Sequence, residues 1–118
     1  MAKHPPYTQF TLKWLRERDY TCGIVEKYNF YSRKTTDLFN IIDIVAMKEG
    51  ELVGVQSTSQ NGKPEHYKTI TQEPRSRLWL STGAKILLLT WTKVLKKRGG
   101  KAKIWKANEY WITKEELK

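Results

Sequence analysis

The sequence contains a single cysteine, Cys22, and this scarcity excludes an intramolecular disulfide and a zinc site built from several cysteines. It also has no apolar run near the roughly 20 residues that a helix needs to cross a bilayer. The N-terminal run Met-Ala-Lys-His-Pro-Pro lacks the apolar region of a secretion signal. We therefore expect a cytoplasmic protein that is neither secreted nor inserted in a membrane.

Acidic residues are scarce as well, since 12 Asp and Glu stand against 22 Lys and Arg and leave a formal net charge of +10. Such an excess favours a polyanionic partner, and nucleic acid is the first candidate. A merely soluble, positively charged surface is the alternative. From Lys85 to the end, ten Lys and Arg and three Glu are interleaved with aromatic residues, which can stack on unpaired bases when they are exposed.

Known nucleic-acid motifs are missing: the chain has no helix-turn-helix, zinc-finger or phosphate-loop pattern. Gly99-Gly100 lacks the flanking strand, spacing and Ser or Thr of a nucleotide loop. Contacts from scattered cations would read the shape and charge of DNA rather than its base sequence. The cations expected to contact nucleic acid are Lys27, Arg33, Lys34, Lys63, Lys96, Lys97 and Arg98.

A chain of 118 residues is long enough for one modest core, so we expect a single domain over residues 1–118. Thr8 is placed to cap a first helix that ends near Asp19. Thr21 to Lys27 is typical of a short strand. The polar and aromatic segment Tyr28 to Thr36 has no clear period and is predicted to be a loop.

A β-hairpin signal follows, in which Leu38 to Met47 and Leu52 to Val55 are apolar strands around a turn at Lys48-Glu49-Gly50. If the turn is centred between Glu49 and Gly50, the numbers of paired residues sum to 99. Asp43 then lies opposite Gln56, and Ile41 lies opposite Thr58. Because side chains alternate along a strand, Asp43, Gln56 and Thr58 would share one face.

The second half of the sequence predicts a helical region that begins at Pro64, is interrupted and restarts at Pro74, and ends at Gly83. The apolar run 86–91 then has the length of a strand buried on both faces, so the order strand, helix, strand implies a parallel crossover. A last hairpin turns at Gly99-Gly100, and residues 110–112 add an edge. Together these elements predict an α/β fold with a mixed central sheet and helices packed on it.

Asp43 is the acidic residue that this pattern places inside an apolar strand, between Ile42 and Ile44. A buried carboxylate is costly unless its charge is paired or holds a metal ion. The alternative is an aspartate at the rim of the sheet that bonds to the backbone or to a lysine.

The segment from Glu26 to Ile70 resembles the PD-(D/E)XK nuclease superfamily, in particular its small archaeal Holliday-junction resolvases and phage-type proteins of the same layout. Val25-Glu26-Lys27 supplies an upstream glutamate, and Asp37-Leu38-Phe39-Asn40-Ile41-Ile42-Asp43 supplies the central aspartate. Val53-Gly54-Val55-Gln56-Ser57-Thr58 stands where the second motif, acid-x-Lys, belongs, with Gln56 thirteen residues beyond Asp43.

The resemblance implies a restriction-endonuclease-like core of the order α-β-β-β-α-β and a phosphodiester hydrolase that acts on DNA with Mg²⁺ or Mn²⁺. It makes Asp43, Gln56 and Glu26 the metal ligands. Asp37 is then a neighbouring acid or an additional ligand, although it also suits a turn or cap before the next strand. Because resolvases act on a two-fold symmetric junction, the resemblance also implies a homodimer.

The departures concern the catalytic motif, because Ile42 replaces its proline, Gln56 its second acid and Thr58 its lysine. Lys68 is the preferred substitute for that lysine and Lys27 is the second choice, although lysines are more often solvated. Three functions stay open: a metal-dependent endonuclease for branched or structured DNA, a degenerate nuclease fold that binds DNA without cutting it, and an unrelated basic RNA-binding protein.

Overall fold

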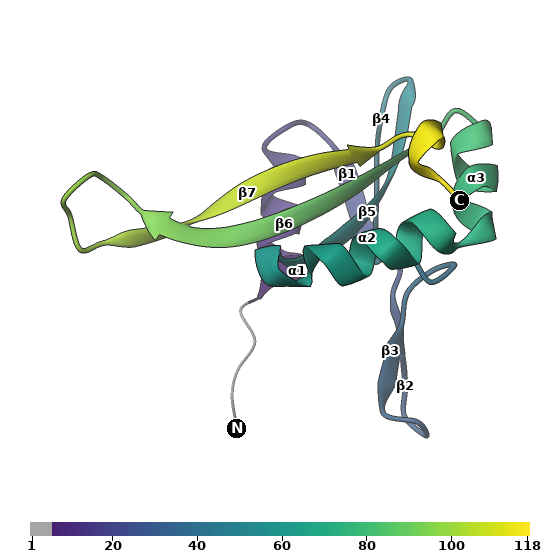
Figure 1. Cartoon of the computed structure of the whole chain (residues 1–118), viewed down its shortest axis with the longest axis horizontal. Coiled ribbons are helices and arrows are strands. Elements are labelled where there is room, and N and C mark those ends of the chain that lie inside the picture. The colour runs from purple at the N-terminus through teal and green to yellow at the C-terminus, as the bar shows by residue number, and fades with distance from the viewer. Residues whose placement is uncertain (1–5) are drawn as a thin grey trace.

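The computed structural model describes residues 6–118, and its centre is a mixed sheet of five strands in the order β1-β4-β5-β6-β7 (Figure 1). The strands are β1 (Thr21–Ile24), β4 (Ile44–Lys48), β5 (Glu51–Ser59), β6 (Lys85–Leu95) and β7 (Lys103–Ile112). Only the β5–β6 pair is parallel, and the other neighbours are antiparallel. The predicted α/β fold with a mixed sheet is confirmed.

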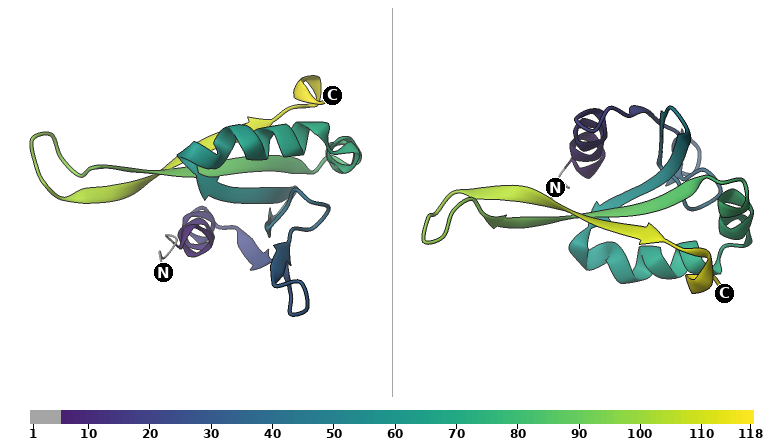
Figure 2. Two further views of the ribbon diagram at one scale, coloured as in Figure 1. Left: turned by 60° about the horizontal axis from the view of Figure 1, so that its bottom comes forward. Right: turned by 90° about the horizontal axis from the view of Figure 1, so that it is seen from above.

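Helices cover both faces of this sheet. Figure 2 shows α1 (Tyr7–Arg16) on one face and α2 (Lys63–Gln72) and α3 (Pro74–Ser81) on the other. Pro74 separates α2 from α3, and Gly83, with φ +90°, ends α3 because its N–H donates to the carbonyl of Leu80. None of the helices in residues 6–118 has the length and apolar character needed to cross a lipid bilayer.

The core has two apolar layers, one on each side of the sheet. Leu87 and Leu89 of β6 pack with Leu15 beneath α1, whereas Ile86 and Leu88 pack with Ile70 beneath α2. All of these side chains have at most 1 % of their surface exposed. The prediction of a β6 strand buried on both faces and joined to β5 by a parallel crossover is therefore confirmed.

The predicted hairpin register is confirmed, because Ile44 pairs with Val55 and Lys48 with Glu51, and both pairs sum to 99. Gly50 takes φ +78° in the turn. The N–H of Asp43 donates to the carbonyl of Val55 at 3.0 Å, a pair that sums to 98, so the register shifts by one residue directly before β4. The predicted pairing of Asp43 with Gln56 is therefore not formed, because the paired register begins at Ile44 and Asp43 bonds to Val55.

The prediction of a strand from Leu38 is wrong, because residues 38–42 form a tight turn and β4 begins at Ile44. Phe39 and Asn40 have φ values of +54° and +66°, and the N–H of Leu38 donates to the carbonyl of Ile42. Ile41 is consequently not opposite Thr58. Ile42 is nevertheless fully buried, so a short apolar run predicted burial correctly and the backbone conformation incorrectly.

Gly54 explains why this turn packs closely on the sheet. A Cβ atom at Gly54 would lie 2.6 Å from Cδ1 of Ile42 and 3.2 Å from the Trp79 ring. Because glycine has no Cβ, the side chain of Ile42 rests directly on the backbone of β5. This contact fixes the turn whose two ends carry Asp37 and Asp43.

Three further predictions need correction. Residues 28–36 are not a loop, because β2 (Lys27–Asn29) and β3 (Lys34–Thr36) form a separate antiparallel hairpin. α1 begins at Tyr7 with Pro6 at its N-cap, so Thr8 lies inside the helix and does not cap it. Residues 110–112 are not an extra edge strand, since β7 pairs with β6 without interruption from Lys103 to Ile112.

Two hairpins project from the sheet, the short β2–β3 hairpin and the long β6–β7 hairpin (Figure 1). β5 pairs with β6 as far as Trp91, and beyond that residue β6 and β7 continue as a two-stranded ribbon to a turn at Gly99-Gly100. Residues 92–106 of this ribbon contain no acidic side chain. Their cations are Lys93, Lys96, Lys97, Arg98, Lys101, Lys103 and Lys106.

Candidate functional site

Three carboxylates meet where β1 ends and β4 begins, and backbone hydrogen bonds bring them there. The N–H of Val25 donates to the carbonyl of Asp43, which holds Glu26 beside the start of β4. The turn at residues 38–42 returns the chain from Asp37 to Asp43. Potential ligand atoms of Glu26, Asp37 and Asp43 consequently all lie within 4.8 Å of one another.

These carboxylates repel one another without a protein cation to balance them. Within residues 6–118 the ion pairs involve Glu51 and Glu73, and none involves Glu26, Asp37 or Asp43. The chain carries 22 Lys and Arg, so cations are abundant. Three close acids that remain unpaired in so basic a protein have the electrostatics of a site for a bound cation.

Asp43 is the deepest of the three, with only 4 % of its surface exposed. Its burial, reinforced by the charges of Asp37 and Glu26, raises its pKa from 3.8 to about 8, although an N–H bond from Ser57 acts in the opposite direction. Burial, and then the charge of Asp37, also raise the pKa of Glu26. Asp43 therefore retains its proton near neutral pH, and a bound metal ion would displace that proton.

Two buried oxygen atoms at this site have no hydrogen-bond partner among the described residues, Oδ1 of Asp43 and Oε1 of Gln56. The other Asp43 oxygen, Oδ2, accepts the backbone N–H of Ser57 at 3.3 Å. Gln56 lies on β5 between Val55, whose carbonyl accepts the N–H of Asp43, and Ser57, whose N–H donates to Oδ2 of Asp43. Unpartnered carboxylate and amide oxygens are suitable ligands for Mg²⁺ or Mn²⁺, so these residues fit a hard divalent cation.

The structure therefore brings together Asp43, Glu26 and Asp37, with Gln56 on the neighbouring strand. Asp37 offers a potential ligand atom to this group, and it also begins the turn that its sequence position predicted, since its carbonyl accepts the N–H of Asn40. Lys68 is exposed on α2, and its ammonium makes no hydrogen bond or ion pair within residues 6–118. Thr58 faces the 3₁₀ turn at Gly62, where a Cβ atom would lie 2.5 Å from its hydroxyl oxygen.

The cations expected at nucleic acid are distributed over three places. Lys27, Arg33 and Lys34 lie on the exposed β2–β3 hairpin. Lys63 opens α2, and its Nζ lies 4.4 Å from the ring centre of Tyr110. Residues 96–98, Lys96, Lys97 and Arg98, are exposed at the tip of the β6–β7 ribbon.

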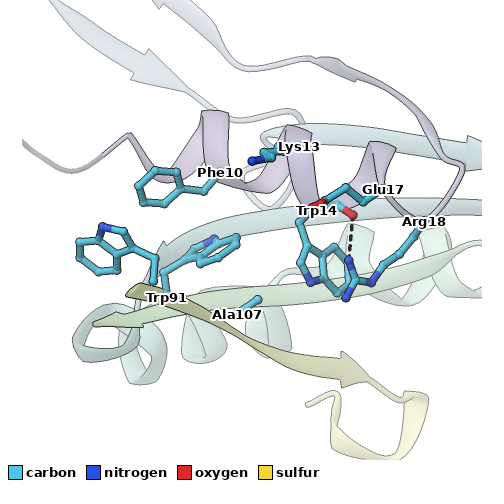
Figure 3. A pocket seen from close by; sticks show the side chains of 8 residues that line it. Phe10, Lys13, Trp14, Glu17, Arg18, Trp91 and Ala107 are labelled. Atoms are coloured by element: carbon cyan, nitrogen blue, oxygen red, sulfur yellow. Dashed lines mark hydrogen bonds between the residues drawn. The ribbon is translucent and has the colours of Figure 1, made fainter. Parts of the chain in front are cut away.

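An aromatic pocket lies on the opposite, α1 side of the sheet, between α1, β6 and β7 (Figure 3). The guanidinium of Arg18 stacks 3.8 Å from the centre of the Trp14 ring and donates to the Trp14 carbonyl. Trp91 is buried and donates its Nε1–H to Thr11. Because Arg18 covers the Trp14 ring and Thr11 accepts the Trp91 N–H, we attribute these side chains to packing rather than to ligand binding.

Comparison with known proteins finds no family model that matches the chain, and neither a curated protein nor a solved structure is significantly similar to it.

Proposed function

We propose that this protein is a metal-dependent endonuclease of the PD-(D/E)XK type that acts on DNA. We further propose that its substrates are branched or otherwise structured DNA. The observation that carries it is the site itself. Among residues 6–118, its three carboxylates have no ion-pair partner and two buried oxygens have no hydrogen-bond partner, in a strongly basic protein.

The order of elements supports this proposal. When the projecting β2–β3 hairpin is set aside, the chain runs α1, β1, β4, β5, α2 and then, after α3, β6. This sequence of elements has the α-β-β-β-α-β order of the restriction-endonuclease-like core. Asp43 then lies directly before β4 and Gln56 lies within β5, on the two strands where that core carries its metal ligands.

The chain's own residues have separate tasks in such a reaction. Asp43, Gln56, Glu26 and Asp37 would hold Mg²⁺ or Mn²⁺, which when bound polarises the scissile phosphate and lowers the pKa of a water molecule. The N–H of Ser57 fixes one Asp43 oxygen and leaves Oδ1 for ligation. The exposed cations of the two projecting hairpins are suited to hold DNA phosphates.

A DNA-binding protein that does not cut is the second candidate, and Thr58 favours it. The superfamily places a lysine at this position, where it orients water or stabilises negative charge. The structure supplies a hydroxyl instead, and Lys68 is exposed on α2. Loss of such a group typically reduces the rate by about 10²- to 10⁴-fold, so a slow enzyme and a binding protein are both compatible with Thr58.

Cleavage assays on labelled duplex, forked, four-way and single-stranded DNA distinguish the two candidates. In Mg²⁺ or Mn²⁺ we expect the native protein to cut, and we expect Asp43→Ala to lose cutting by at least about 10²-fold while it retains DNA binding, because the substitution removes the most buried ligand. Glu49→Gln is the matched control, since Glu49 is an exposed acid in the β4–β5 turn. Tight binding without cutting in any divalent metal would leave the second candidate.

The β6–β7 ribbon is expected to contribute phosphate contacts that do not depend on base sequence. Replacing Lys96, Lys97 and Arg98 together by glutamine should weaken duplex binding by about tenfold near 0.1 M salt and flatten the slope of log K against log salt by up to about 2.7. Fluorescence anisotropy in a salt series measures both quantities. Lys114→Gln with Lys118→Gln is the control at the opposite end of the molecule (Figure 1), and an equal loss in this control would contradict a specific role for the ribbon.

A further inference from the structure

The β2–β3 hairpin is isolated from both apolar layers of the protein. Its strands pair only with each other, from Lys27↔Thr36 to Asn29↔Lys34, and every residue from 27 to 36 is exposed. Figure 2 shows it projecting away from the sheet and helices. Such a short hairpin gains little stability from burial. Its shape therefore depends on local hydrogen bonds, and its function depends on what it contacts.

The tip of this hairpin carries the two most exposed large apolar side chains of residues 6–118. Tyr31 has 101 % and Phe30 has 83 % of its surface exposed, and Tyr28 behind them is 50 % exposed. Tyr28 and Phe30 contact each other edge to face, with ring centres 5.3 Å apart. Since aromatic side chains normally bury most of their surface, adjacent exposed rings at one tip indicate a binding surface.

Local hydrogen bonds hold this tip in shape without any packing. The side-chain oxygen Oδ1 of Asn29 accepts the backbone N–H groups of Tyr31 and Ser32 at 2.8 and 3.1 Å. The N–H of Arg33 donates to the Asn29 carbonyl, and Arg33 takes φ +56° to close the turn. The rings are therefore presented on a defined backbone and do not need to be ordered from a flexible loop.

The charge of the hairpin selects the chemistry of the partner. Residues 27–36 contain Lys27, Arg33 and Lys34 and no acidic side chain. A second copy of the chain would bring the same positive charge and would be repelled. Exposed rings beside cations are suited to a nucleic-acid strand, in which bases stack on the rings and phosphates meet the cations.

The hairpin is also joined directly to two of the carboxylates. Glu26 immediately precedes Lys27, Asp37 immediately follows Thr36, and both acids belong to the group around Asp43. A strand rises roughly 3.3 Å per residue, so the rings lie roughly 10–13 Å from the Lys27↔Thr36 pair. A strand whose phosphate lies at the carboxylates can therefore reach the rings with bases only a few nucleotides away.

We propose that the β2–β3 hairpin is a stacking site for unpaired DNA bases, in which Phe30 and Tyr31 contact the bases and Arg33 and Lys34 contact the adjoining phosphates. This proposal rests on the proposed nuclease function and specifies its substrate as DNA with a single-stranded segment beside the cleaved phosphate. A fully paired duplex or four-way junction would lack the bases that the rings stack on.

Binding measurements in EDTA test this proposal independently of cleavage. We expect Phe30→Ser with Tyr31→Ser to weaken binding to a duplex with a single-stranded overhang by about 10- to 100-fold. Binding to the blunt duplex of the same sequence should change less than about twofold, because phosphate contacts remain. Leu78→Ser is the matched control, since Leu78 is a 67 % exposed apolar side chain on α3.

A second measurement reports stacking directly. With 2-aminopurine in the overhang, we expect the native protein and Phe30→Tyr to quench its fluorescence and the double serine variant to leave it unchanged. The proposal is overturned if the native protein binds overhang and blunt DNA equally well, or if the double substitution weakens binding to both equally. It is also overturned if the rings instead mediate self-association that the double substitution abolishes, or if they bind anionic vesicles in place of overhang DNA. These measurements use neither cleavage nor the Asp43→Ala variant. They can therefore be interpreted even if the protein is not a nuclease.

Discussion

Asp43→Asn is expected to stabilise the metal-free protein by roughly 4–6 kcal/mol at pH 9, at about 1.4 kcal/mol for each unit of pKa shift. Burial, with the charges of Asp37 and Glu26, raises the pKa of Asp43 to about 8, from 3.8 without these influences. Asparagine has nearly the same shape and no charge. It keeps an oxygen that can accept the N–H of Ser57, which now bonds Asp43 at 3.3 Å.

The sign of the pH dependence follows from proton binding. The folded protein holds the Asp43 proton more tightly than the unfolded chain does, so Asp43 has no cost below about pH 4, where both states are protonated. Between about pH 4 and 8 the unfolded state ionises first and stability falls. Above about pH 8 both states are ionised and the cost is constant. The advantage of Asp43→Asn should therefore grow with pH over that interval.

Urea unfolding in EDTA from pH 5 to 9 measures this difference. Other acids titrate in both proteins, so the difference between the wild type and Asp43→Asn isolates one group. The free energy of unfolding of Glu49→Gln should differ from that of the wild type by an amount that does not change with pH, because Glu49 is exposed. An Asp43→Asn variant that is less stable than the wild type at pH 9 would show that Asp43 has a stabilising partner.

Affinity for Mg²⁺ or Mn²⁺ is expected to fall by up to tenfold for each pH unit below about 8, or about 100-fold between pH 8 and pH 6. Asp43 must lose its proton before Oδ1 can ligate, so binding one cation releases one proton. Glu26, whose pKa is also raised, steepens the fall toward lower pH. Metal-free stability and metal affinity should thus change in opposite directions with pH.

Calorimetry in two buffers with different ionisation enthalpies measures both the affinity and the released proton. Asp43→Asn should bind weakly and with a smaller dependence on pH over this interval, whereas Glu49→Gln should behave as the wild type does. A metal affinity that is independent of pH between 6 and 8 would place the cation away from Asp43. Cleavage is not needed for either result, so the metal site is tested separately from catalysis.

The sequence predicted most accurately the parts of the fold in which burial and turn chemistry agree. The β4–β5 register followed from Gly50, whose positive φ suits the turn, and from apolar residues on either side of it. That register predicted Asp43 near Gln56, and the structure places Asp43 against the two neighbours of Gln56 in β5, Val55 and Ser57. The Pro74 break, the Gly83 stop and the parallel β6 strand were predictable for the same reason.

Tertiary packing decided the parts that were not predictable. Leu38, Ile41 and Ile42 belong to one apolar layer, and Ile42 packs on Gly54, but this apolar composition does not distinguish the turn at residues 38–42 from a strand. The β2–β3 hairpin buries neither face, so it shows no alternation of apolar and polar residues by which a strand is recognised. The exposure of its aromatic residues 28, 30 and 31 at a hairpin tip could not be predicted from the sequence and is seen only in the structure.

The pairing of Lys27 with Thr36 at the foot of the β2–β3 hairpin makes this segment an exchangeable module. The two chain ends enter and leave the body side by side, so a hairpin of different length or composition can join the same two points without altering β1, β4 or either apolar layer. New substrate preferences can therefore arise by insertion at this point while the acids that flank it stay in place. The same junction is a natural place to graft recognition hairpins in protein engineering.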